Sequence, residues 1–163
     1  MSHDETVARL DGLDFYRHVV ELARGGTDAL PSVHAGLSHP DWRIRRGCAA
    51  VLGYVDDAES LQRLALLTRD PKKKVRKMAV LSIGLGPLLR KGNRSPFDPV
   101  PSLGHSALHD PSVRVRRVAV VTLLLQPPAR RVARLLRKVL ATEQDEKAVR
   151  VAGWALRQHE QRA

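Results

Sequence analysis

The stretch Asp110-Pro111-Ser112-Val113-Arg114-Val115-Arg116-Arg117 occurs, with changes, four times along the chain. The other copies are residues 39–46, 70–77 and 144–151. Each copy centres on a β-branched anchor followed by Arg: Ile44-Arg45, Val75-Arg76, Val115-Arg116 and Val149-Arg150. Four positions after each anchor comes a small residue: Cys48, Ala79, Ala119 and Gly153. The anchors are 31, 40 and 34 residues apart, and self-similarity at such a period is typical of helical repeat proteins.

The chemistry of one copy predicts the start of a helix. Asp70 and Asp110 are suited to cap a helix N-terminus, which places Pro71 and Pro111 at the first helical position, where a missing N–H costs nothing. Apolar residues at 75, 78, 79 and 83, and again at 115, 118, 119 and 123, mark one helix face. The segments 28–37, 57–67 and 127–140 read as amphipathic partner helices. Each repeat is therefore predicted to be a helix A, a turn and a helix B.

These repeats predict an all-α fold, an α-solenoid of about four helical pairs, over a single domain of residues 1–163. Residues 1–26 are expected to form N-terminal cap helices, and residues 27–158 the repeats. The 40-residue interval contains a surplus rich in Gly and Pro, which break helices. We therefore expect an inserted loop over residues 85–99 that carries Arg90, Lys91 and Arg94.

The repeat unit resembles HEAT-like repeats of the phycobilin-lyase type. The resemblance rests on the Asp-Pro, on the Val-Arg that begins four residues after the Pro, and on the small residue further on. The resemblance covers residues 27–158. It implies that the B helices line a concave surface, and that the Arg after each anchor pairs with an Asp near the start of the same or an adjacent B helix. The structural ladder so implied consists of Arg45, Arg76, Arg116 and Arg150 with Asp70 and Asp110. Because such repeats serve scaffolds, lyases, hydroxylases and DNA glycosylases alike, the fold alone leaves the function open.

The charge of the chain is strongly positive and unevenly distributed. The 28 Lys and Arg exceed the 17 Asp and Glu by 11. Residues 1–42 carry a net charge of −4, and residues 43–163 a net charge of +15. A basic body indicates an anionic partner such as nucleic acid, an acidic protein surface or an anionic lipid. The alternative is a set of Arg-rich, solvated helix faces without a partner.

Two further positions are basic in three successive repeats, one on each side of the anchor-Arg pair. They are occupied by Arg43 and Arg46, by Lys74 and Lys77, and by Arg114 and Arg117. Residues three apart share a helix face, so stacked B helices about 10 Å apart would align these cations. Cations near a helix N-terminus oppose its dipole, so helix stability does not explain them. The fourth copy has Ala148 and Val151 at these places. We expect a basic groove that binds partners, the alternative being a solvated basic rim.

Enzymatic and metal-binding interpretations find little support. The single His-Glu pair, His159-Glu160, lies near the end of the chain, and no histidines are spaced with carboxylates on one helix face. Trp42, with Asp41 beside it and Tyr54 further on, only faintly resembles the aromatic site of HEAT-like DNA glycosylases. His39 stands where other repeats have a capping Asp. Cys48 is predicted to be a small core residue and not a nucleophile, and no cofactor or metal is expected.

The sequence thus favours a non-catalytic, cytoplasmic scaffold that binds an acidic protein or nucleic acid, with a monomer as the default. One alternative is a sequence-independent DNA or RNA binder related to the glycosylases. Another is an enzyme, or an accessory subunit such as that of a HEAT-repeat lyase, that uses residues 85–99. No run of about 18 apolar residues predicts insertion in a membrane, and residues 1–10 lack the pattern of a secretory signal.

Overall fold

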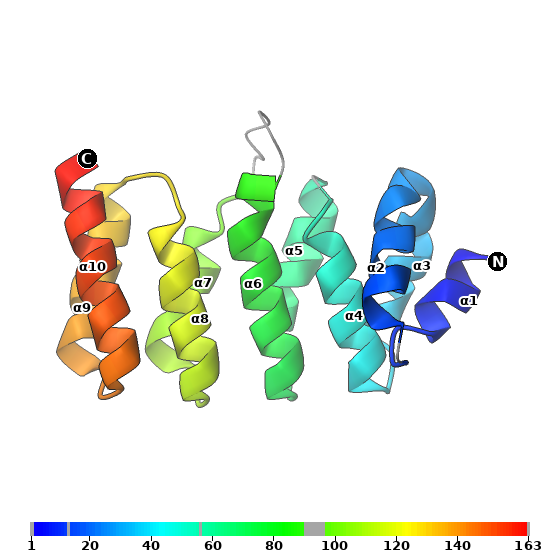
Figure 1. Ribbon diagram of the computed structural model, residues 1–163, viewed down its shortest axis with the longest axis horizontal. Helices are drawn as coiled ribbons and strands as arrows, with labels where there is room; N and C mark the ends of the chain where they lie inside the picture. The colour runs from blue at the N-terminus through cyan, green and yellow to red at the C-terminus, as the bar shows by residue number, and fades with distance from the viewer. Residues whose placement is uncertain (1, 13, 56, 90–96, 163) are drawn as a thin grey trace. The chain divides into compact units, whose positions relative to one another are not determined.

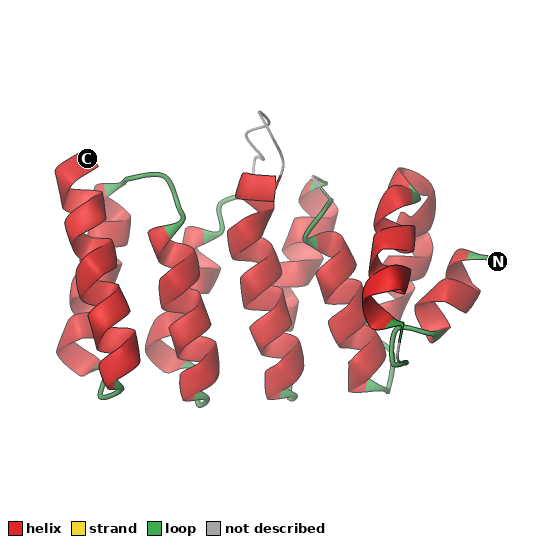
Figure 2. Cartoon of the chain, viewed as in Figure 1, coloured by secondary structure: helices red, strands yellow, loops and turns green. Residues whose placement is uncertain are grey.

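The computed structural model describes residues 2–12, 14–55, 57–89 and 97–162, which contain helices and no strand (Figures 1 and 2). The chain divides into two compact units, residues 1–97 and 98–163, named here the N-terminal and C-terminal units. The helices of the N-terminal unit are α1 (His3–Ala8), α2 (Phe15–Arg24), the 3₁₀ helix η1 (Gly26–Ala29), α3 (Leu30–Gly36), α4 (Trp42–Leu52), α5 (Ala58–Leu67) and α6 (Lys73–Leu89). Those of the C-terminal unit are α7 (Val100–His109), α8 (Val113–Leu124), α9 (Arg130–Thr142) and α10 (Glu146–Arg162).

Within each unit the helices pack as stacked pairs. In the N-terminal unit the B helices α2, α4 and α6 are successive neighbours, with α3 packed on α4 and α5 on α6. In the C-terminal unit α8 packs on α10, while α7 and α9 pack behind them (Figure 1). This two-layer arrangement of helix A and helix B confirms the predicted all-α, solenoid-type fold.

The B helices bury the positions that the repeat pattern marks. Ile44 and Cys48 of α4 are buried, as are Val75 and Ala79 of α6 and Val115 and Ala119 of α8. Close helix crossings require small residues here. A Cβ added at Gly36 of α3 would collide with the Sγ of Cys48, so α3 and α4 approach each other closely at this point.

The Asp-Pro turns differ from the prediction by two residues. The Asp70 and Asp110 carboxylates accept hydrogen bonds from the backbone amides of Lys72 and Ser112, at 2.7 and 2.8 Å, and the helices begin only at the following residues, 73 and 113. The two prolines therefore precede the helix and are not its first residues. Each Asp closes a tight turn in front of the helix, as Asp side chains commonly do.

His39 takes the same place as Asp70 and Asp110, because its Nδ1 accepts a hydrogen bond from the Asp41 amide at 3.0 Å. The predicted capping role of His39 is thus seen as closure of the turn, and Asp41 itself is the N-cap of α4.

The predicted 85–99 loop is wrong over its first part. Helix α6 continues to Leu89 through Gly84, Gly86 and Pro87, so three residues that disfavour helix do not end it. Residues 90–96, which include the basic residues predicted for the loop, lie outside the described ranges. Helix α7, which starts at Val100, was not predicted, because the Gly- and Pro-rich composition masked its short apolar pattern.

The fourth repeat is shifted by one residue from its predicted alignment. Glu143 accepts a hydrogen bond from the Asp145 amide at 2.9 Å, which is the turn that Asp110 makes with Ser112. Five residues after Glu143 stands Ala148, which is fully buried, and Ala152 is fully buried four residues later. These two residues, and not Val149 and Gly153, hold the anchor and small positions.

The space around Gly153 supports the same shift. A Cβ added there would meet only the Arg157 Nη1, at 3.8 Å, so no helix crosses closely at this residue. The Val-Arg dipeptide was misleading, because the buried anchor of α10 is an alanine.

Candidate binding surface on the B helices

Arg45 connects the turns of two successive repeats in the N-terminal unit. Its Nε and Nη2 donate to the two carboxylate oxygens of Asp70, at 2.7 and 3.1 Å. Its Nη1 donates to the carbonyls of His39 and Pro40, at 2.8 and 2.9 Å. The Asp70 side chain is only 4% exposed, so this two-pronged pair is largely shielded from water and is a structural element.

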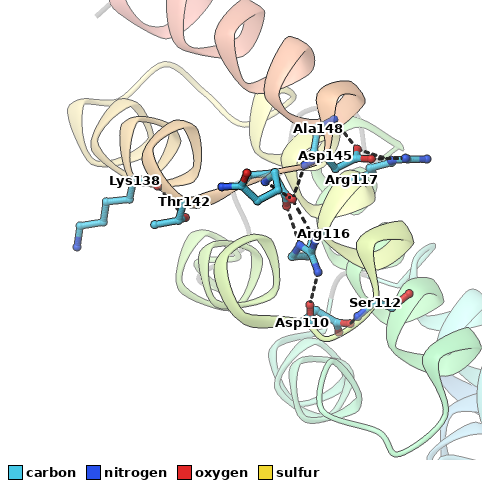
Figure 3. A network of polar contacts seen from close by, with 10 residues as sticks. Asp110, Ser112, Arg116, Arg117, Lys138, Thr142, Asp145 and Ala148 are labelled. Atoms are coloured by element: carbon cyan, nitrogen blue, oxygen red, sulfur yellow. Dashed lines mark hydrogen bonds and ion pairs between the residues drawn. The ribbon is translucent and has the colours of Figure 1, made fainter.

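Arg116 makes the equivalent connection in the C-terminal unit (Figure 3). Its Nε and Nη2 donate to Glu143 at 2.6 and 3.0 Å, and its Nη1 donates to the Asp110 carbonyl at 3.0 Å. The hydrogen bond from Arg116, aided by backbone amides, holds the pKa of Glu143 below its ordinary value. The carboxylate that Arg116 uses is thus a Glu, whereas the resemblance implied an Asp.

The other two ladder residues behave differently from each other. Arg76 donates to the carbonyls of Asp70 and Pro71, at 3.0 and 3.2 Å, as Arg45 and Arg116 do in their own turns. The predicted ladder role of Arg150 is wrong, because the shifted alignment gives the ladder place in α10 to Val149. Arg150 is instead an exposed residue at the position that Arg117 holds in α8.

A cluster of cations surrounds Trp42 at the start of α4. The charged groups lie 4.7–5.6 Å from the Trp42 ring centroid and come from the first five residues of α4 and from residues 72 and 74, at the start of α6. Measured from that centroid, the distances are 5.1 Å for Arg43 Cζ, 5.6 Å for Arg46 Cζ, 5.4 Å for Lys72 Nζ and 4.7 Å for Lys74 Nζ. These four cations and Trp42 are called the Trp42 cluster below. Two successive repeats therefore bring the predicted Arg43, Arg46 and Lys74 to one place, with Lys72 beside the ring and Lys77 not among its contacts.

Among the described residues, the cations of the Trp42 cluster make one ion pair. Asp41 pairs with Arg43 at 3.3 Å, whereas Arg46, Lys72 and Lys74 make no ion pair with any residue that the structure describes. The Arg46 guanidinium also lies 4.4 Å from the centroid of the Phe15 ring. Its Nε is buried without a hydrogen-bond partner among the described residues.

The cluster contributes little to folding on balance. Each exposed cation–ring contact stabilises by about 0.5–1 kcal/mol. Like charges oppose this gain, since two unit charges about 8 Å apart in water repel each other by about 0.5 kcal/mol, and four cations form several such pairs. The first turn of a helix further disfavours cations by a few tenths of a kcal/mol each. Fold stability does not account for the gathering of these cations.

The C-terminal unit carries its own basic positions, one of which is used internally. Arg117 donates to both carboxylate oxygens of Asp145, at 2.6 and 2.5 Å (Figure 3). Asp145 also accepts from the Ala148 amide at 2.9 Å and so caps α10. Arg117, predicted as a partner contact, is therefore held in an internal ion pair, whereas Arg114 is exposed.

The shifted alignment also changes the fourth repeat. Lys147 and Arg150 now stand at the two basic positions that the repeat pattern assigns to Ala148 and Val151, and both are exposed. Basic residues thus occupy these positions in the fourth repeat as well. Sequence reasoning missed this because its alignment was one residue off, and the acid-closed turn at Glu143 was the signal that could have corrected it.

The residues considered for catalysis have structural surroundings. Burial raises the pKa of the Cys48 thiol to about 12, which makes it a poor nucleophile. His159 is buried, and its Nε2 lies 3.0 Å from the Leu123 carbonyl oxygen. Across the described ranges, no group of three or more His, Cys, Asp or Glu side chains could hold a metal ion.

Comparison with known proteins agrees with the stacked pairs. A family model of HEAT repeats matches residues 17–84, from within α2 to within α6. The match and the all-helical stacking together support a HEAT-like repeat protein, a class that generally mediates protein–protein interaction and scaffolding. A search of curated proteins gave no match. Among the described residues, no helix is both long and apolar enough to cross a membrane.

Proposed function

We propose that this protein is a non-catalytic scaffold that binds an acidic protein partner through cations at the starts of its B helices. The observation that carries the proposal is the Trp42 cluster, where four cations from two repeats meet beside a single paired acid. Positive charge in excess of the internal counter-charge attracts an anionic partner and speeds its association. The Asp-Pro and Val-Arg pattern supports placing these repeats in the phycobilin-lyase type.

Each unit contributes basic residues by itself. The N-terminal unit contains 16 Lys and Arg against 11 Asp and Glu, and the C-terminal unit contains 12 against six. The proposed contacts of the N-terminal unit are Arg43, Arg46, Lys74 and Lys77. Those of the C-terminal unit are Arg114, Lys147 and Arg150, without the internally paired Arg117.

A second candidate is a sequence-independent nucleic-acid binder. Tyr16 of α2 is 80% exposed and packs edge-on against Phe15, whose ring contacts Arg46. Exposed aromatic rings beside cations suit the stacking of bases from single strands. The protein partner is favoured because HEAT repeats generally mediate protein–protein interaction.

Charge reversal at Lys74 and Lys77 tests the proposal. Both residues lie in the first turns of α6, where glutamates suit the helix dipole, so K74E/K77E is expected to fold normally. The Kd of a fluorescent polyglutamate peptide should rise by about tenfold or more. A tenfold change corresponds to about 1.4 kcal/mol of binding free energy, which the loss of two charge contacts and their replacement by like charges supplies. The matched control is R24E/R157E, which changes the net charge equally at two exposed residues outside the first turns.

The outcome separates the candidates. Unchanged peptide affinity in K74E/K77E would overturn the proposed surface. Tight binding of an oligonucleotide, with a log–log salt slope that decreases in magnitude by nearly one unit for each cation removed, would support the nucleic-acid candidate instead.

A further inference from the structure

The Trp42 cluster is compact, which sets it apart from a basic row along a helix. Its four charged groups surround one indole ring and come from both α4 and the start of α6. A guanidinium offers five N–H donors and an ammonium three, so one small anion at this point could accept from several side chains at once.

Two of these side chains are held in place by aromatic contacts. Arg46 lies against both Phe15 and Trp42, at 4.4 and 5.6 Å from the ring centroids. Lys74 lies 4.7 Å from the Trp42 centroid. A cation held over a ring keeps its charge, so these contacts order the side chains without neutralising them. Ordered donors bind with a smaller entropy loss than free ones.

We propose that the Trp42 cluster binds the phosphate of a phosphorylated side chain in the partner protein. The inference rests on the proposed function, whose acidic partner it makes specific. A phosphomonoester carries a charge of about −1.5 to −2 and three acceptor oxygens, so it offers several neighbouring cations more charge and more acceptors than a single carboxylate does.

Nucleic acid fits the cluster less well. A phosphodiester backbone spreads single charges along a strand, and single-strand binders add free aromatic faces on which bases stack. The Trp42 ring has four of the chain's own cations around it, so it orders donors and does not offer an open platform. The gathering of four cations around one ring therefore favours one highly charged group on a protein segment.

The test uses Trp42 as its own reporter. The chain has two tryptophans, so the full-length W154F variant leaves Trp42 as the single source of tryptophan fluorescence. The probes are three short acidic peptides that differ only at a central phosphoserine, Glu or Ser. The phosphoserine peptide should change the Trp42 emission and bind about tenfold more tightly than the Glu peptide, because its charge-assisted hydrogen bonds are more numerous.

Matched charge variants locate the effect. K72Q/K74Q removes two members of the cluster, whereas the control R69Q/K73Q removes two exposed charges nearby that belong neither to the cluster nor to the proposed contacts. The preference for phosphoserine over Glu should fall to about twofold or less in the first variant and remain in the second. Trp42→Leu, which keeps every charge, should also weaken the preference; should it fail to fold, the charge variants still decide.

The other outcomes are distinguishable. Equal affinity for the phosphoserine and Glu peptides, still sensitive to K74E/K77E, would overturn the phosphate site and leave the proposed function standing. No binding of any acidic peptide would overturn both. An oligonucleotide that binds more tightly than the phosphopeptide, and is lost in K72Q/K74Q, would replace both with nucleic-acid binding.

Discussion

The alignment of the fourth repeat gives opposite predictions for two adjacent residues of α10. Ala152 is fully buried, in a helix that packs against both α8 and α9. Ala152→Leu adds three carbons at this packed position, and overpacking of this kind costs about 1–3 kcal/mol. Gly153 faces open space, where an added Cβ would come no closer than 3.8 Å to its nearest neighbour. Gly153→Ala should therefore stabilise the helix by about 0.5–1 kcal/mol through reduced backbone entropy.

Urea unfolding followed by circular dichroism measures both changes. The emission of Trp154, which lies in α10, can be read in a W42F background to follow the C-terminal unit alone. The free energies of unfolding of the two variants should differ by about 1.5–4 kcal/mol. Ala119→Leu in α8, the equivalent position of the preceding repeat, serves as the control and should resemble Ala152→Leu.

The reverse result would refute the shifted alignment. If Gly153→Ala destabilised the protein while Ala152→Leu did not, then Gly153 would be the crossing residue, as the Val-Arg pattern alone suggests. The position of Arg150 would then return to the ladder, and the basic positions of the fourth repeat would be lost.

Three other predictions follow from single contacts. Because Arg116 lowers the pKa of Glu143, their pairing should stabilise the C-terminal unit at pH values above the ordinary pKa of about 4.3. This stabilisation should be lost as the pH falls through the lowered pKa. Glu143→Gln should flatten this acid dependence of urea unfolding, and an unaltered dependence would count against a stabilising role of the pair. The Cys48 thiol, with a pKa raised to about 12 by burial, should react with iodoacetamide far more slowly in the native than in the unfolded protein, and equal rates would contradict its burial. Gly36→Ala should cost about 1–3 kcal/mol of stability, because the new Cβ collides with Cys48 Sγ and lies 2.9 Å from Val7 Cγ1; a stability equal to that of the wild type would show that α3 can move away.

The sequence predicted the fold from positions whose burial is local and periodic. Ile44, Val75 and Val115 are the buried anchors of three B helices, as expected. The fourth anchor was misplaced because hydrophobicity and burial disagree there: Val149 is the more apolar residue, but the smaller Ala148 is the one packed inside. An alignment on the turn acids instead of the dipeptide would have found it.

The candidate surface was only partly predictable, because its side-chain contacts depend on tertiary packing. The pattern identified Arg43, Arg46 and Lys74, but gave no sign that they would meet around Trp42 with Lys72. Likewise, an ion pair between Arg117 and Asp145 forms only once α8 and α10 lie side by side. Spacing along a helix fixes which face a residue takes and leaves open what the neighbouring helix places opposite it.

The difference between the ladder and the proposed binding surface is visible in the residue types that each position accepts. Neighbours on a helix point about 100° apart, so Arg45 faces the next turn while Arg46 faces Phe15 and Trp42. The ladder position is Arg in α4, α6 and α8, since its contacts need a planar group that donates in two directions, which Lys lacks. The two flanking positions alternate freely between Lys and Arg, with Lys74 and Lys147 among them. A position that accepts either Lys or Arg requires only a positive charge, as binding of an anionic partner would. In the N-terminal unit such cations gather around Trp42, where Asp41 pairs with Arg43.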